Sequence, residues 1–157
     1  MEQTAKISFD KKFWDEMYKQ LRLRGQGVRE SGAFLLGPEE NNSITQALYY
    51  DDLEPESLDT GAIHITYKSF IALADYCLLN KLTVKADTHT HPGIVTQQSD
   101  IDMENPMIKI AGHMALIIPS FALPKKCNLN MLGIHEFIGG GYNWRSYHFK
   151  QGIIKII

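Results

Sequence analysis

The sequence predicts an α+β fold with a mixed, largely antiparallel sheet and helices packed on its faces. Two segments repeat apolar residues at the spacing of an amphipathic helix, and shorter apolar or alternating runs lie between and after them. Most neighbouring strand-like runs are joined by short turns, which favours antiparallel pairs over the long crossovers that parallel strands need. With 157 residues, the chain is expected to form a single domain over residues 1–157.

The first helix is predicted directly after a short strand over Ala5–Phe9. Asp10 is a suitable N-cap, and the apolar residues that follow it fall three or four positions apart, on one face of a helix. Those residues are Phe13, Trp14, Met17, Tyr18 and Leu21. The glycines of RGQGVRE then separate this helix from the next element.

A buried strand is predicted over Glu30–Gly37, with Glu30 at its head and Gly37-Pro38 closing it. After the polar turn PEENN, the run SITQALYYDDL alternates well enough to form an antiparallel partner strand. EPESLDTG is expected to be a loop, and Ala62–Thr66 a further short strand.

The second helix is predicted over YKSFIALADYCLLN and ends near Asn80, with Phe70, Leu73, Ala74, Cys77 and Leu78 at helical intervals. Leu82–His89 is predicted to be a strand, which Pro92-Gly93 breaks just after His91. Beyond a short helix at SDIDMEN, three more strands are predicted. They are HMALIIPSFA, LNMLGIHEFI and YNWRSYHF, the last two joined through Gly139, Gly140 and Gly141.

Composition and charge narrow the classes of partner and location. Apolar residues make up 44% of the chain and charged residues 22%, which is typical of folded proteins. The formal net charge of -2 and a pI near 6.3 give no reason to expect nucleic acid or an anionic membrane as a partner. No run reaches the roughly 18 apolar residues of a membrane span, so a cytoplasmic protein is expected. Cys77 and Cys127 form no C-x-x-C pair and are expected to be free thiols.

The stretch HTHPGIVTQQSDID, residues 89–102, contains the residues that point to chemistry. On a strand, His89 and His91 are two apart and face the same way, so their imidazoles can converge on one ion. After the turn at Pro92-Gly93, Ser99 can cap a short helix whose first turn brings Asp102 back towards the histidines. Two nitrogens and one carboxylate oxygen form a known catalytic zinc set that leaves one position for water. Such a site also needs a nearby base.

These residues resemble the signature of the JAMM (MPN+) zinc metalloproteases, also called JAB-domain proteases. The pattern is H-x-H-P, six residues, then S-x-x-D, preceded by a strand of the form E-S-G-x-x-L-x-G. It is filled by His89-Thr90-His91-Pro92, by Ser99 to Asp102, and by Glu30 to Gly37. The order of helices and strands fits that family from about Ala5 to Phe149, and implies its cytidine-deaminase-like layout.

The resemblance implies a role for each residue. His89, His91 and Asp102 bind Zn²⁺, Glu30 is the general acid/base, and Ser99 donates a hydrogen bond to the oxyanion. Family members cleave the bond after the C-terminus of a ubiquitin-like protein, in conjugates or in precursors. The short chain is most similar to the compact prokaryotic members, which accompany ubiquitin-like proteins and E1-like and E2-like enzymes, notably in antiphage defence. Two alternatives remain: processing of a sulfur-carrier protein, and a noncatalytic MPN-type scaffold module.

Each candidate residue also has a purely structural interpretation. His89 and His91 alone are compatible with a solvent-facing strand, and Ser99 with Asp102 is a known helix-start pattern. Asp100 is a rival ligand, but a helix turns about 100° per residue, so it faces away from Asp102. The remaining histidines are interpreted as structural, the three glycines as a hairpin turn, and both tryptophans as core or edge aromatics. Those histidines are His64, His113, His135 and His148.

Overall fold

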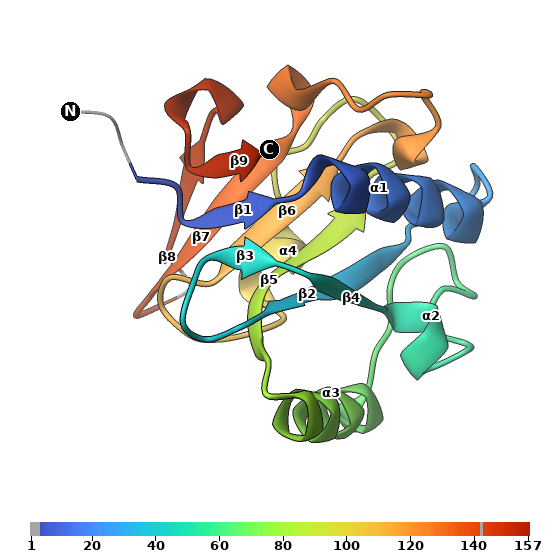
Figure 1. The fold of residues 1–157 in the computed structure, drawn as a ribbon. Coiled ribbons are helices and arrows are strands. Elements are labelled where there is room, and N and C mark those ends of the chain that lie inside the picture. Colours follow the sequence, from blue (N-terminus) through green and yellow to red (C-terminus); the bar gives the residue numbers. More distant parts are fainter. Residues whose placement is uncertain (1–3, 142) are drawn as a thin grey trace.

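A six-stranded sheet forms the centre of the molecule in a computed structural model that describes residues 4–141 and 143–157 (Figure 1). The strand order is β4-β2-β5-β6-β7-β8. Only β5 and β6 run parallel among these neighbours, and every other pair is antiparallel. The predicted α+β class with a mixed, largely antiparallel sheet is therefore confirmed. The strands are β2 (Gly32–Gly37), β4 (Gln46–Tyr49), β5 (Thr83–Thr90), β6 (Met114–Ile118), β7 (Gly133–Gly139) and β8 (Asn143–Tyr147).

A second, smaller sheet joins the two ends of the chain. Its order is β3-β1-β9, with β1 (Ile7–Phe9) in parallel register with both β3 (Ser43–Ile44) and β9 (Ile154–Ile156). The sequence predicted β1, although over a longer range, and it did not predict β9. Strands of two or three residues carry too short an alternation to be distinguished from loop.

Helices cover both faces of the six-stranded sheet, as predicted. α1 (Lys11–Gly25) begins at Asp10, whose carboxylate accepts hydrogen bonds from the backbone N–H groups of Lys12 and Phe13. Its apolar face joins the larger buried cluster, which includes Leu35 and Leu116 of the sheet. α3 (Tyr67–Asn80) covers the opposite face with α2 (Tyr50–Leu53), as Figure 1 shows. A short helix, α4 (Asp100–Glu104), lies further along the chain.

Two of the predicted strands are wrong in part or in full. The run from Ser43 was expected to stay extended through Leu53, but its last four residues form α2, and Tyr50 packs edge-on against Phe34. Ala62–Thr66 pairs with no strand among the described residues. Its backbone bonds to the preceding loop instead: the His64 N–H donates to Ser57 O. An alternating pattern alone does not reveal whether a partner strand is present.

The C-terminal strands are shorter than their apolar runs suggested. The residues after β6 form a turn over Ser120–Ala122, and Leu129–Met131 form one 3₁₀ turn before β7. β7 and β8 are antiparallel neighbours, as predicted, and Gly139 at the end of β7 and the two glycines that follow it all have positive φ. Cys77 and Cys127 are both free thiols, as expected.

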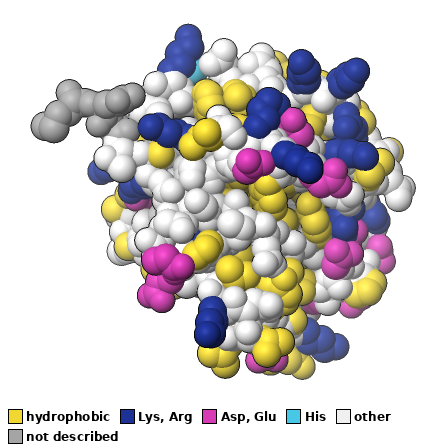
Figure 2. Space-filling model, in the orientation of Figure 1, with side chains coloured by type: hydrophobic (Ala, Val, Ile, Leu, Met, Phe, Trp, Pro, Cys, Tyr) yellow, Lys and Arg dark blue, Asp and Glu magenta, His cyan; other side chains and the backbone are white. Residues whose placement is uncertain are grey.

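Two surface properties bear on location and partners. Within the part of the chain that the structure describes, no helix combines the length and the apolar character needed to cross a bilayer. On the face shown in Figure 2, Lys and Arg side chains gather over the region of α1, and Asp and Glu side chains lie among them. This face therefore presents no uninterrupted basic surface.

Glu54 is a buried acid that fixes the start of α3. One carboxylate oxygen accepts four hydrogen bonds, from the backbone N–H and hydroxyl groups of Thr66 and of Ser69, at 2.6–3.2 Å. The hydrogen bond from the Ser69 hydroxyl is the largest cause of a lowered pKa at Glu54. A carboxylate with a lowered folded-state pKa contributes stability above its unfolded pKa, about 4.3, and loses it as the pH falls through the folded value.

We expect Glu54→Gln to lower the free energy of unfolding by about 2 kcal/mol at pH 7, because four donors lose a charged acceptor. The difference from the wild type should shrink in acid, where Glu54 itself becomes protonated. Urea denaturation from pH 7 down to pH 3 measures both effects. Glu56→Gln, an exposed neighbour, is the matched control and should change little. A loss that is equal at every pH would contradict this assignment.

Candidate metal centre

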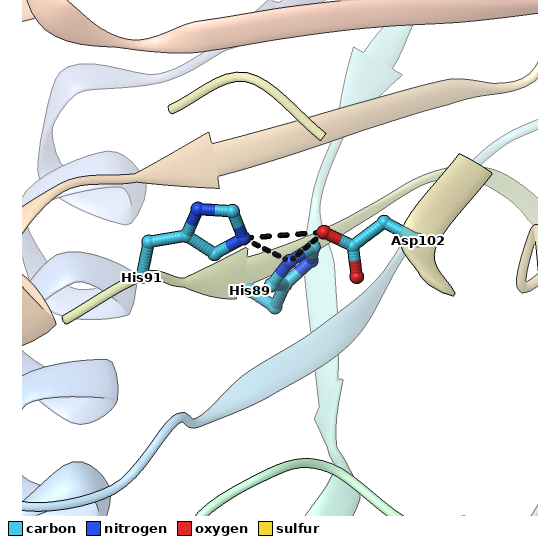
Figure 3. A group of neighbouring side chains, drawn as sticks. All are labelled: His89, His91 and Asp102. Atoms are coloured by element: carbon cyan, nitrogen blue, oxygen red, sulfur yellow. Dashed lines mark hydrogen bonds and ion pairs between the residues drawn. The ribbon is translucent and has the colours of Figure 1, made fainter. Parts of the chain in front are cut away.

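The paired histidines lie where β5 ends, between two neighbouring strands. β5 pairs with β2 on one side and β6 on the other, and the backbone N–H of His91 still donates to Ile118 O beyond the last strand residue. His89 and His91 therefore keep the alternation of the strand, and both imidazoles face α4, which carries Asp102 (Figure 3). The expected convergence of the three side chains is present.

The ligand atoms are spaced as a small metal ion requires. The two Nε2 atoms of His89 and His91 lie 3.1 Å apart, and Asp102 Oδ2 lies 3.5 Å and 3.2 Å from them. Tetrahedral ligands at about 2.0–2.1 Å from zinc lie about 3.3 Å from one another. The three residues thus fit a zinc ion in spacing and in chemical type.

A second hydrogen bond orients the His91 ring for this task. Its Nδ1 lies 3.0 Å from the carbonyl oxygen of Val95. Because a carbonyl only accepts, Nδ1 must carry the proton, and the lone pair of the neutral ring is then on Nε2, which faces Asp102. His91 is therefore held in the tautomer that can bind a metal.

Ser99 and Asp102 form a reciprocal capping box at the start of α4. The Ser99 hydroxyl accepts from the Asp102 backbone N–H at 3.1 Å, and Asp102 Oδ2 accepts from the Ser99 backbone N–H at 3.0 Å. The helix-start interpretation of S-x-x-D is therefore confirmed, and the same cap directs the Asp102 carboxylate towards the imidazoles. Asp100 is exposed and lies outside the cluster, as expected.

Glu30 lines a cavity of about 230 Å³ together with His89, Ser99 and Asp102. It lies two residues before β2, and its backbone N–H donates to Gly61 O. Antiparallel pairing of Gly32 with His89 brings this segment beside the histidines. The glycine is required there, because a Cβ at Gly32 would lie 2.5 Å from Thr88 O and 2.6 Å from the Tyr50 ring.

The electrostatics of the site favour a bound cation. Burial raises the pKa of Glu30, and the imidazoles of His89 and His91 oppose that shift. Burial would also raise the pKa of Asp102, but hydrogen bonds from both imidazoles hold it well below its ordinary value. For His91, burial is outweighed by hydrogen bonds to Asp102 and Val95, which raise its pKa. The Asp102 carboxylate therefore stays ionised, which is the form that binds a metal ion.

The other histidines have different roles from one another. His113 Nε2 lies 2.6 Å from Asp87 Oδ2 in the interior, and His148 caps a 3₁₀ turn. His135 contacts Ser146 and Thr96. The sequence places all four in apolar strand surroundings, but His64 and His148 are exposed and lie outside strands, so that expectation is wrong for these two.

Asp87 and Trp144 are among the residues of the cavity wall that sequence reasoning did not assign to the site. Trp144 lies on the edge strand β8 and packs against Phe137, in agreement with its interpretation as an edge aromatic. It also lines the cavity, and its Nε1–H donates to Met103 O of α4. No local pattern marks it, because only the arrangement of β8 beside α4 places it there. Asp87 had a weak signal, since it lies two residues before His89 on the same face of β5.

A left-handed turn over Ser120–Ala122 binds the backbone of the histidine loop, residues 91–93. Ser120, Phe121 and Ala122 have φ values of 56°, 53° and 57°, a conformation that costs residues with a Cβ roughly 1–2 kcal/mol each. The Phe121 N–H donates to His91 O at 2.8 Å, and the Ser120 N–H donates to Gly93 O at 2.9 Å. The backbone on both sides of Pro92 is thereby fixed.

Comparisons with known proteins establish the fold alone. No protein-family model matches the chain. Among solved structures, a protein from Desulfitobacterium hafniense is similar over 96% of this chain and 92% of its own, with a TM-score of 0.67 and 17% identity. A protein from Salinibacter ruber matches 84% of this chain and 85% of its own, with a TM-score of 0.50 and 15% identity. A JAB1/MPN domain protein from Archaeoglobus fulgidus is matched over 98% of this chain and 98% of its own, with a TM-score of 0.49 and 12% identity.

Proposed function

We propose that the chain is a zinc-dependent peptidase of the JAMM/MPN+ type, which cleaves after the C-terminus of a ubiquitin-like protein. The observation that carries this proposal is the meeting of two imidazole nitrogens and one carboxylate oxygen within 3.1–3.5 Å, at a cavity that Glu30 shares. Such an arrangement combines a three-ligand metal site with a separate carboxylate that is free for proton transfer.

The chain's own residues divide the chemistry. A zinc ion bound by His89, His91 and Asp102 supplies Lewis acidity for the water and for the scissile carbonyl. Glu30 accepts a proton from the attacking water and delivers it to the departing amine, a task favoured by a raised pKa. The Ser99 hydroxyl already accepts from Asp102 N–H, so its own proton is available to the carbonyl oxygen as negative charge develops there.

The wall of the cavity suits an extended peptide. Ala62 and Ile63 line it, and they belong to segment 62–66, which pairs with no strand among the described residues. A flexible C-terminal tail added along that segment would reach the metal site in extended form. The small volume of the cavity favours glycine at the residues that flank the scissile bond.

The pathway we favour is a cytoplasmic bacterial antiphage system, in which the enzyme removes a ubiquitin-like protein from targets or trims its precursor. Its partners are then the modifier, its conjugates, and the E1-like and E2-like enzymes of the same pathway. Nucleic acid and membranes are not expected as partners. Processing of a sulfur-carrier protein and a noncatalytic scaffold role are the competing proposals.

One experiment separates these proposals. The purified protein is incubated with a panel of bacterial ubiquitin-like modifiers and sulfur carriers, each carrying a C-terminal extension, with and without a zinc chelator. We expect one modifier to be cut after its natural C-terminus, at low enzyme concentration and only without chelator. Cleavage confined to the sulfur carriers would select that alternative. A protein that binds no zinc and cuts nothing would be a scaffold.

A further inference from the structure

We propose that His135, on β7, is a positioning residue for the metal centre. Its imidazole holds Thr96, and through Thr96 the chain segment that joins the paired histidines to Asp102. This inference rests on the metal site proposed above and adds a residue that lies outside the JAMM signature. His135 is 5% exposed and touches none of the three ligand atoms through a hydrogen bond of its own.

The partners of His135 define its tautomer. Nε2 lies 2.9 Å from the carbonyl oxygen of Thr96, which can only accept, so Nε2 carries the proton. Nδ1 is then the acceptor, and it takes the hydroxyl proton of Ser146 at 2.8 Å. Burial lowers the pKa of His135, in agreement with a neutral ring that donates once and accepts once.

Two hydrogen bonds join Thr96 to the stretch of chain that leads into β7. Its carbonyl accepts from His135, and its hydroxyl donates to Met131 O at 2.7 Å. Gly133 permits this approach, because a Cβ there would lie 2.2 Å from Thr96 O and 3.0 Å from His135 Nε2. Residues 131–135 therefore bind Thr96 through two hydrogen bonds and leave room for its carbonyl at Gly133.

The position of Thr96 matters to the metal ligands on both sides. The preceding carbonyl, that of Val95, accepts the Nδ1–H of His91 and so fixes the tautomer of that ligand. Three residues after Thr96, Ser99 begins the capping box that orients Asp102. A shift of Thr96 would therefore move the Val95 carbonyl away from His91. It would also move α4, which carries Asp102.

Apolar packing contributes little to the position of the segment around Thr96. The side chains of Ile94 and Val95 are 68% and 64% exposed, so the segment gains little from burial of its own residues. The described polar contacts with His91, Met131 and His135, together with the Ser120 amide on Gly93, hold it instead. Among these, His135 alone contributes a side-chain donor from the sheet.

Two substitutions separate positioning from simple packing. His135→Gln places an amide N–H near the position of Nε2 and can still donate to Thr96, whereas His135→Asn places its amide near Nδ1 and cannot reach. The measurement is the affinity for zinc alone, by competition with a chromophoric chelator. Loss of an outer partner typically costs a metal site about 10–100-fold in affinity. We expect that loss for His135→Asn and less than about 3-fold for His135→Gln.

The controls make each outcome decisive. Ser146→Ala removes only the Nδ1 partner and should bind zinc nearly as the wild type does. Should His135→Asn fail to fold, Thr96→Val, which removes the hydroxyl bond to Met131, is expected to show a partial loss of zinc affinity with a folded metal-free state. Equal affinities for His135→Asn and the wild type, or equal losses for Asn and Gln, would overturn the proposal. If the wild type itself binds no zinc, the proposed function fails instead.

Discussion

Glu30→Gln is expected to abolish nearly all peptidase activity while zinc binding stays intact. The substitution keeps the shape of the side chain and removes its ability to accept a proton from water. General acid/base groups typically contribute about 10²–10⁴-fold, and kcat should fall by that factor. Because Glu30 is not among the three converging ligands, the zinc content per chain should match that of the wild type.

The assay for Glu30→Gln compares kcat on the modifier fusion with zinc content on the same preparation. Glu104→Gln, which alters an exposed acid of α4, is the matched control and should retain full activity. A variant that loses zinc along with activity would show that Glu30 acts as a ligand. An unchanged kcat in a preparation free of wild-type enzyme would remove Glu30 from the mechanism.

Asp102→Asn is expected to destroy the metal site. It replaces a charged oxygen that lies within 3.5 Å of both imidazoles by a neutral amide, which is a much poorer ligand for zinc. The loss of zinc affinity should exceed the 10–100-fold typical of outer partners, and activity should be lost with it. Helix α4 should persist, since an asparagine oxygen can still accept from the Ser99 N–H.

The matched control for Asp102→Asn is Asp100→Asn, which alters the rival acid two residues earlier. Asp100 is exposed and outside the cluster, so zinc affinity should stay within about 3-fold of the wild type. Chelator competition on both variants gives the comparison. The opposite order of effects would transfer the ligand role to Asp100.

Local geometry explains which parts of the site could be predicted. The convergence of His89 and His91 follows from the two-residue period of a strand, and the approach of Asp102 follows from the Ser99 cap. The place of Glu30 does not follow from its own neighbours in sequence. It depends on the pairing of Gly32 with His89, a contact between residues 57 positions apart, and only the resemblance to a family predicted it.

The parts of the fold that local sequence patterns determine were also predictable. Long periodic segments such as α1, α3 and β5 were predicted with their approximate ends, because each carries many repeats of its period. The errors lie where contacts between residues distant in sequence determine the secondary structure. Tyr50 packs on Phe34 and starts α2 within an alternating run, and β9 exists only because β1 lies beside it.

The left-handed turn behind the histidine loop has a consequence for local unfolding. Three residues with a Cβ adopt an unfavourable left-handed conformation. This conformation allows the amides of Ser120 and Phe121 to donate hydrogen bonds to the carbonyls of Gly93 and His91. Neither segment keeps its shape without the other, so the two should open together as one cooperative unit. Slow hydrogen exchange at the amides of Ser120 and Phe121 should therefore report the integrity of the loop that begins at His91.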